Sequence, residues 1–179
     1  MNRPFSRLRR FAIAAVALVL AFVLFRSQVA QALIVRGDEF LYRGNTPAAL
    51  ERYQRALALM PESQTAADRY AFLSLQQNTP SSLRRAITIA GRYLRRHPGD
   101  AVLLTDRALC YLHQKRYALA QNDFERAARS SRSPESFVFA GWAAEHAGRA
   151  KSARTLWRLA LSVRHGYRPA LIALSEHGR

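Results

Sequence analysis

The sequence predicts an all-α protein: an α-solenoid of about four helix hairpins with a C-terminal capping helix, preceded by an N-terminal apolar helix. From about residue 30 onward, apolar and small residues recur at spacings of three and four, as in helices with one buried face. The prolines from Pro47 onward, together with Gly44, Gly99, Gly148 and Gly166, fall where such helices would begin or end. A pattern of small and aromatic residues also returns at intervals of about 33 residues, which indicates stacked helical repeats.

The N-terminus has the composition of a membrane-targeting segment. Residues 1–10 form a basic leader with four arginines and no acidic residue, and residues 11–25 contain no polar side chain. We therefore predict a transmembrane signal-anchor over residues 11–29. Fifteen helical residues extend only about 22 Å, against about 30 Å of hydrocarbon. Arg10 and Arg26, reaching toward the bilayer surfaces, and the mixed segment of residues 27–35 can close this gap.

Two alternatives to the anchor remain. The segment could be a secretory signal cleaved near Ala32, after the "AQA" of residues 30–32, or a buried core helix of a soluble protein. Both targeting interpretations place the rest of the chain outside the cytoplasm, with the basic leader inside. For a bacterial protein we expect a single-pass inner-membrane protein with a periplasmic C-terminal domain, or a periplasmic or secreted protein after cleavage.

The second helix of each predicted hairpin carries the clearest repeat. A small, an aromatic and a small residue follow one another at spacings of four and three, and the second and third of these sets start 33 residues apart. The three sets are Ala49, Tyr53, Ala56; Ala120, Phe124, Ala127; and Ala153, Trp157, Ala160. Small residues allow the paired helices to approach closely, and the large rings fill the space between hairpins.

The first helices repeat in step with the second ones. The pairs Gly37–Phe40, Ala108–Tyr111 and Gly141–Ala144 stand twelve and nine residues before Ala49, Ala120 and Ala153, respectively. This combined pattern resembles the tetratricopeptide repeat (TPR) family over about residues 30–167. The resemblance implies a repeat domain over residues 30–179, with repeats at 30–62, 63–100, 101–133 and 134–167 and a cap at 168–179.

The tripeptide Asn-Thr-Pro occurs twice, 33 residues apart, at residues 45–47 and 78–80. Thr46 and Thr79 are expected to cap the second helices of the first two repeats, with Pro47 and Pro80 as first helical residues. Pro98, however, lies 37 residues after Pro61. We therefore expect about one extra helical turn in the second helix of repeat 2.

The charge balance suggests an anionic partner without identifying one. The chain has 28 basic and 12 acidic residues, a net charge of +16, and only two of the basic residues are lysines. An anionic polymer or membrane surface would suit this excess, but an arginine-rich composition can also reflect a GC-rich genome. We consider nucleic acid an improbable partner, because the aromatic residues occupy core repeat positions.

No pattern in the sequence predicts catalysis. We find no phosphate-binding glycine loop, no serine nucleophile motif and no pair of histidine or cysteine residues at metal-ligand spacing. His146 beside Glu145 is typical of a solvated helix face, and the single cysteine, Cys110, lies in an apolar stretch expected to be buried. We predict no enzyme activity, no cofactor and no metal.

The resemblance implies partner binding on a concave face lined by the first helix of each repeat. Tyr42 and Trp142 are the strongest candidates for dominant contacts, although Trp142 could instead pack against its neighbouring helix. The matching positions are Asp38, Leu41, Tyr42, Thr105, Leu109, Leu112, His113, Val138, Trp142, Glu145 and His146. We thus predict a non-enzymatic scaffold for a protein or peptide partner, tethered by its N-terminal helix, that assists the assembly of an envelope complex. The alternative is a basic module that binds an anionic polymer or membrane surface.

Overall fold

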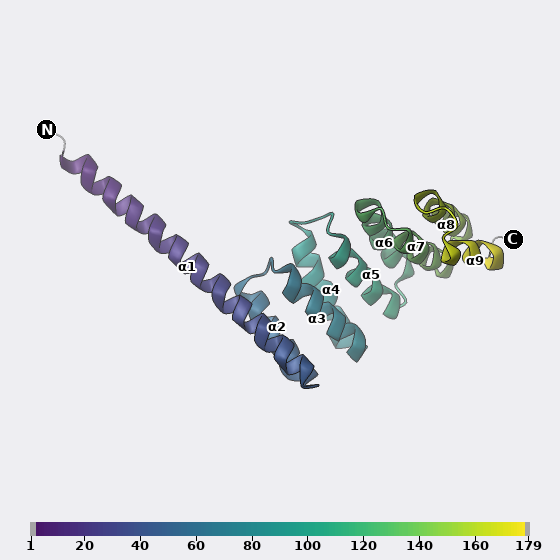
Figure 1. The fold of residues 1–179 in the computed structure, drawn as a ribbon, viewed down its shortest axis with the longest axis horizontal. Helices are drawn as coiled ribbons and strands as arrows, with labels where there is room; N and C mark the ends of the chain where they lie inside the picture. The colour runs from purple at the N-terminus through teal and green to yellow at the C-terminus, as the bar shows by residue number, and fades with distance from the viewer. Residues whose placement is uncertain (1–2, 178–179) are drawn as a thin grey trace. The chain divides into compact units, whose positions relative to one another are not determined.

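The computed structural model describes the backbone of residues 3–177 and the side chains of residues 9–177. The described chain consists of helices joined by short turns, with no strand (Figure 1). The all-α prediction is therefore confirmed, whereas part of the basic leader and the last two residues of the cap lie outside the described residues. The helices are α1 (Arg3–Tyr42), α2 (Thr46–Leu59), α3 (Gln64–Gln77), α4 (Pro80–Leu94), α5 (Ala101–His113), α6 (Tyr117–Ser131), α7 (Pro134–His146), α8 (Ala150–Val163) and α9 (Arg168–His177).

The chain divides into two compact units, and the first, Met1–Ser63, is a hairpin of α1 and α2. The helix α1 is continuous for 40 residues and carries the apolar run without a break into the first repeat. Ala30 and Ile34 of α1 are buried in the same hairpin as Tyr53 of α2. A Cβ atom on Gly37 would lie 2.5 Å from Cε1 of Tyr53, so only glycine allows the ring to approach this closely.

The second unit, Gln64–Arg179, contains α3 to α9, and each helix packs against the next one in the chain. The predicted small and aromatic positions of the third and fourth repeats are fully buried: Ala120, Phe124, Ala127, Ala153, Trp157 and Ala160. Helix α9 packs on α8 and α7 and buries Ala170 and Ala173 in the same core. The unit is thus a stack of three hairpins with a capping helix, as the sequence predicts.

A buried ion pair joins the two helices of the α5–α6 hairpin. The guanidinium of Arg107 donates to both carboxylate oxygens of Asp123, at 2.7 and 2.8 Å, and the Asp123 side chain is only 4% exposed. Burial by itself would lower the pKa of Arg107, but the hydrogen bond and charge of Asp123 outweigh it and raise that pKa. The pair therefore stays charged inside the hairpin.

The two Asn-Thr-Pro turns differ by one residue in register. Thr79 caps α4 as predicted: its side chain accepts a hydrogen bond from the amide of Ser82. The corresponding prediction for Thr46 is wrong, since Asn45 caps α2 through its contact with the amide of Ala48. The left-handed residue of the first turn is Gly44 (φ +75°), and that of the second is Asn78 (φ 47°), so the cap falls one residue earlier.

The predicted extra turn in the second helix of repeat 2 is also wrong. Helix α4 has 15 residues and α2 has 14, so the helices differ by only one residue. The additional length lies mainly in residues 95–100, where the amides of Arg96 and His97 both turn back to the carbonyl of Tyr93. Pro98 therefore marks a longer connection and not a longer helix.

Candidate partner-binding face

A pair of half-exposed aromatic rings lies on α7. Trp142 is 38% exposed and Phe139 is 37% exposed, and the two rings meet edge to face with their centroids 5.4 Å apart. Phe139 in turn stacks on the buried ring of Phe124 from α6, at 5.5 Å. The rings of Phe124, Phe139 and Trp142 thus form a continuous row from the core to the surface. At the surface, the two α7 rings form a rigid apolar platform.

The other faces of α7 explain why these rings point outward. The side chain of Ser133 caps the helix by accepting from the amide of Ser136, and Pro134 occupies the first helical position. A Cβ atom on Gly141 would lie 2.1 Å from Nε1 of Trp157, so α7 packs closely against α8 at this glycine. This packing fixes the rotation of α7 and leaves Trp142 on its open side.

The remaining predicted residues of α7 differ in accessibility: Val138 is buried, Glu145 is partly buried and His146 is exposed. The side chain of Val138 is 2% exposed and belongs to the core, so a partner cannot reach it at the surface. Oε1 of Glu145 lies 2.9 Å from Nδ1 of His177 on α9, and the ring of His146 stacks on Tyr117 at 5.2 Å. Glu145 and His146 are therefore held by contacts within the chain.

The predicted residues of α5 differ in how far their side chains are accessible. Leu109 and Leu112 are partly buried and pack against the core of the second unit. The hydroxyl of Thr105 donates to the carbonyl of Ala101 at 2.8 Å. His113, at the end of the helix, is exposed. Of this group, the His113 imidazole is the most open to a partner, and Thr105 and the two leucines are partly accessible.

In the first unit, the predicted residues lie at the end of α1. Tyr42 is the last residue of the helix and its side chain is 94% exposed, whereas Leu41 is partly buried. The carboxylate of Asp38 accepts a hydrogen bond from the hydroxyl of Tyr53 at 2.6 Å. Asp38 therefore serves the packing of the hairpin, and Tyr42 is the accessible member of this group.

Sequence reasoning missed several accessible residues of the second unit. Phe72 on α3 is 49% exposed, and Val102 on α5 is 46% exposed. Repeat 2 gave no prediction because its register could not be aligned with the other repeats. The signal that could have found Phe139 is its position one helical turn before Trp142, which places both on one face.

Asp106 on α5 is an acidic group that the sequence did not single out. Burial raises the pKa of its carboxyl to about 8, and the charge and hydrogen bond of Asp68 and the charge of Asp100 add to the effect. Its Oδ2 has no hydrogen-bond partner within the described residues. Asp106 is therefore a carboxyl that holds its proton at neutral pH, beside a second carboxylate on α3.

Other reactive chemistry is not assembled in the part of the chain that the structure describes. Within it, no group of three or more histidine, cysteine or acidic residues could hold a metal ion. Cys110 is buried, and burial together with the charge of Asp106 raises the pKa of its thiol to about 12. The thiol therefore stays protonated and packs as a small apolar group.

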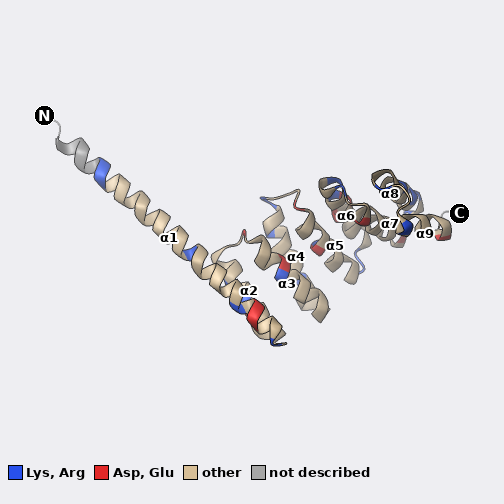
Figure 2. Cartoon of the chain, viewed as in Figure 1, with Lys and Arg blue, Asp and Glu red and all other residues tan. Residues whose placement is uncertain are grey.

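The helices α4 and α8, which are the second helices of repeats 2 and 4, carry basic surfaces. Helix α4 and the turn after it contain no acidic residue before Asp100, and α8 contains none at all. The basic side chains in these regions are exposed except for Arg154, which is partly exposed, and Figure 2 shows basic residues spread over most helices of the second unit. They are Arg84, Arg85, Arg92, Arg95, Arg96, Lys151, Arg154 and Arg158.

Comparisons with known proteins agree on the fold. The chain matches a crystal structure of MamA with a TM-score of 0.69 and 13% identity, covering 84% of each chain. It matches PilF of Pseudomonas aeruginosa with a TM-score of 0.65 and 21% identity, covering 85% of this chain and 68% of that one. It also matches YrrB, described as a TPR protein with an unusual peptide-binding site, with a TM-score of 0.67 and 14% identity, covering 92% and 87%.

No protein-family model matches the sequence, and no curated protein does. The assignment of the fold therefore rests on the structural matches. At these sequence identities the matches show the fold alone. That fold is the helix-hairpin stack of TPR proteins, as the repeat pattern predicts.

Proposed function

We propose that the chain is a non-enzymatic scaffold that binds a protein or peptide through the open face of its repeat unit. The observation that carries the proposal is the Phe139–Trp142 pair, because two large rings are held rigidly at a surface that nothing else in the described chain covers. Rigid, half-exposed aromatic rings are the side chains that most often dominate binding energy at protein interfaces. Folds of this kind accommodate extended peptides, and YrrB carries a peptide-binding site.

We further propose that α1 tethers the scaffold to the inner membrane of a bacterium, with the repeats outside the cytoplasm. By length and composition, α1 is a candidate membrane span, and its most apolar stretch is wholly exposed. Figure 2 shows a long stretch of α1 without charged residues. The basic leader favours a cytoplasmic N-terminus. In that position the scaffold would serve the assembly of an envelope complex.

The packing of the first unit favours an anchor over a cleaved signal. Ala30 is fully buried, and the guanidinium of Arg26 donates to the carbonyl of Leu59 at the end of α2. Cleavage near Ala32 would remove this part of α1 and expose the side of α2 that it covers. Mass spectrometry of the mature N-terminus tests the point: a chain that begins at Leu33 would contradict the anchor.

The binding proposal is tested by Trp142→Ala in the full-length chain, purified from membranes in detergent. We expect partner capture to fall at least about tenfold, as for a dominant interface residue. Leu159→Ala is the matched control, since Leu159 on α8 is also 38% exposed but belongs to a second helix. Equal loss in both variants, or loss in neither, would show that the face on α7 is not the binding surface.

A second candidate function is binding of an anionic polymer or membrane surface by the basic helices. The absence of acidic residues from α4 and α8 favours it, because these helices contribute positive charge and no negative charge to the surface. Binding of this kind weakens steeply with salt. If partner capture is unchanged between low and high ionic strength while Trp142→Ala abolishes it, the aromatic face is responsible and not the arginines.

A further inference from the structure

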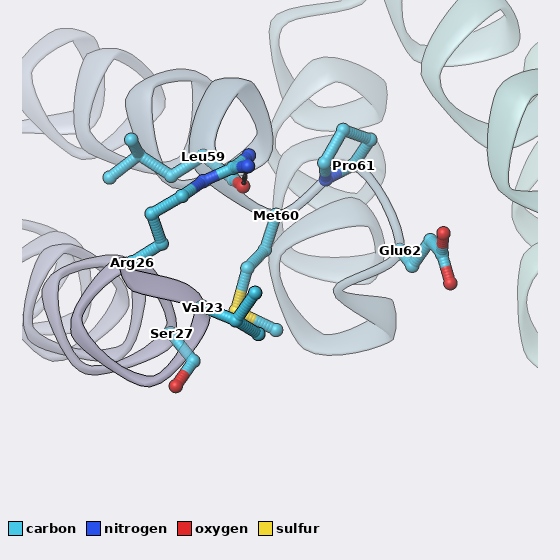
Figure 3. A pocket seen from close by; sticks show the side chains of 7 residues that line it. All are labelled: Val23, Arg26, Ser27, Leu59, Met60, Pro61 and Glu62. Carbon is cyan, nitrogen blue, oxygen red and sulfur yellow. Dashed lines mark hydrogen bonds between the residues drawn. The ribbon is translucent and has the colours of Figure 1, made fainter. Parts of the chain in front are cut away.

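A small pocket lies between α1 and the connection that follows α2. We use the name elbow for residues 59–62, which are the last residue of α2 and the first three residues of the connection. The pocket has a volume of about 260 Å³ and is lined by one turn of α1 and by the elbow (Figure 3). Its lining residues are Val23, Arg26, Ser27, Leu59, Met60, Pro61 and Glu62. In Figure 3 the side chains of Val23 and Met60 lie together, and the carboxylate of Glu62 points away from them.

Arg26 fixes the elbow at one level along α1. Its guanidinium donates to the carbonyl of Leu59, the last residue of α2, where the helix dipole places partial negative charge. The same guanidinium lies 5.6 Å from the centroid of the Phe22 ring. These contacts hold the elbow beside the end of the apolar run, residues 11–25.

The apolar run is too short to cross a bilayer without help. Its 15 residues extend about 22 Å, and the hydrocarbon core is about 30 Å thick, so about 8 Å remain to be covered. Val23 belongs both to the apolar run and to the lining of the pocket. The apolar surface of the run is therefore continuous with the surface of the elbow. Leu59 and Met60 are only partly buried and Pro61 is exposed. Apolar side chains are therefore available at the level where the run ends.

We propose that the elbow rests in the interfacial layer of the bilayer, with the pocket filled by the upper part of a phospholipid. This inference depends on the membrane anchor proposed above and adds a second contact with the lipid. The apolar lining suits acyl methylenes, and a guanidinium at the same level suits a lipid phosphate. Lipid is favoured over a protein segment because the pocket adjoins the apolar run, whose large apolar side chains are exposed and would contact the bilayer in the proposed anchor.

The test measures the depth of single labels in the full-length chain reconstituted in phospholipid vesicles. In a Cys110→Ala background, an environment-sensitive fluorophore is attached at Met60→Cys, and lipids carry a quencher either near the headgroup or deep in the acyl chain. Leu18→Cys, in the apolar run, and Tyr42→Cys, at the far end of the hairpin, provide the controls. Tyr42 lies 16 residues beyond Arg26, about 24 Å along the helix.

We expect headgroup-labelled lipid to quench Met60→Cys, deep-labelled lipid to quench Leu18→Cys, and neither to quench Tyr42→Cys. If Leu18→Cys is not quenched, the anchor itself is wrong. If Leu18→Cys is quenched and Met60→Cys is not, the anchor stands and the elbow inference is overturned, whether water or protein fills the pocket. Pro61→Cys, at an exposed position, provides a second label if Met60→Cys disturbs the fold, which circular dichroism would detect.

Discussion

At the scale of single residues, Asp106 makes stability depend on pH in an unusual direction. The pKa of its carboxyl is raised from 3.8 to about 8, first by burial and then by Asp68 and Asp100. Between pH 4 and 8 the folded chain therefore keeps a proton at this site that the unfolded chain has lost. This contribution to stability is present below about pH 4 and is lost as the pH rises toward 8.

Asp106→Asn should remove this dependence, because an amide stays neutral at every pH. We expect the variant to gain more than about 1 kcal/mol of stability relative to the unmodified chain between pH 5 and pH 8. Denaturant unfolding at several pH values measures the difference, in which the titration of the five histidines cancels. A difference between the two chains that is constant across this range would show that Asp106 ionises normally.

At the scale of helices, close contact between α7 and α8 depends on matched sizes at two positions. The fourth repeat pairs Gly141 with the buried ring of Trp157, and the third pairs Ala108 with the smaller ring of Phe124. The first repeat pairs Gly37 with Tyr53, whose ring also leaves no room for a Cβ atom. In these repeats, glycine accompanies the larger rings and alanine the smallest one.

Gly141→Ala should therefore destabilise the chain by about 1–3 kcal/mol, because the new methyl group would overlap the indole of Trp157. Trp157→Phe should cost about 2 kcal/mol through lost packing. The double variant places alanine opposite phenylalanine, as in the third repeat. Its loss of stability should therefore be at least about 1 kcal/mol smaller than the summed losses of the two single variants. Thermal or denaturant unfolding of the four chains measures this coupling.

Gly91→Ala is the control for that cycle. A Cβ atom there would meet only Nη1 of Arg107, at 3.5 Å, so the substitution should be neutral or stabilising by up to about 1 kcal/mol. Strict additivity of the Gly141 and Trp157 substitutions would show that the two positions are not matched.

The helices could be predicted closely because proline, glycine and the small–aromatic pattern mark both their ends and their faces. The cap of α2 could not, since it depends on which residue adopts the left-handed conformation, Gly44 or Asn45. The exposure of the predicted binding residues could be anticipated only in part. Trp142 was expected and is accessible, but Val138 is buried because α7 packs on both α6 and α8. A helix with neighbours on two sides exposes a narrower strip than its repeat positions suggest.

At the scale of the whole chain, the stack of the second unit depends on its last helix. Ala170 and Ala173 of α9 are buried against the core, and the ring of His177 lies 6.0 Å from that of Trp157. Hairpin stacks need such a cap because their end would otherwise expose apolar side chains to water.

A chain that ends at Tyr167 should therefore lose about 2 kcal/mol of stability and melt several degrees lower. Calorimetry or circular dichroism measures the change. Glu145→Gln is the control, since it changes only the partly exposed contact with His177 and should cost less than about 1 kcal/mol. An unchanged melting temperature in the shortened chain would mean that α9 does not stabilise the stack.

The unbroken course of α1 has a mechanical consequence for the first unit. No turn separates the apolar run from Tyr42, so the hairpin is coupled in torsion to the run that we propose as the membrane anchor. Each residue added within the run would turn the hairpin by about 100° about the helix axis and shift it by about 1.5 Å. Seven residues would restore its azimuth to within about 20° while lifting it by about 10 Å. If the run is the membrane anchor, its length therefore sets both the height of the hairpin above the bilayer and the direction in which Tyr42 faces.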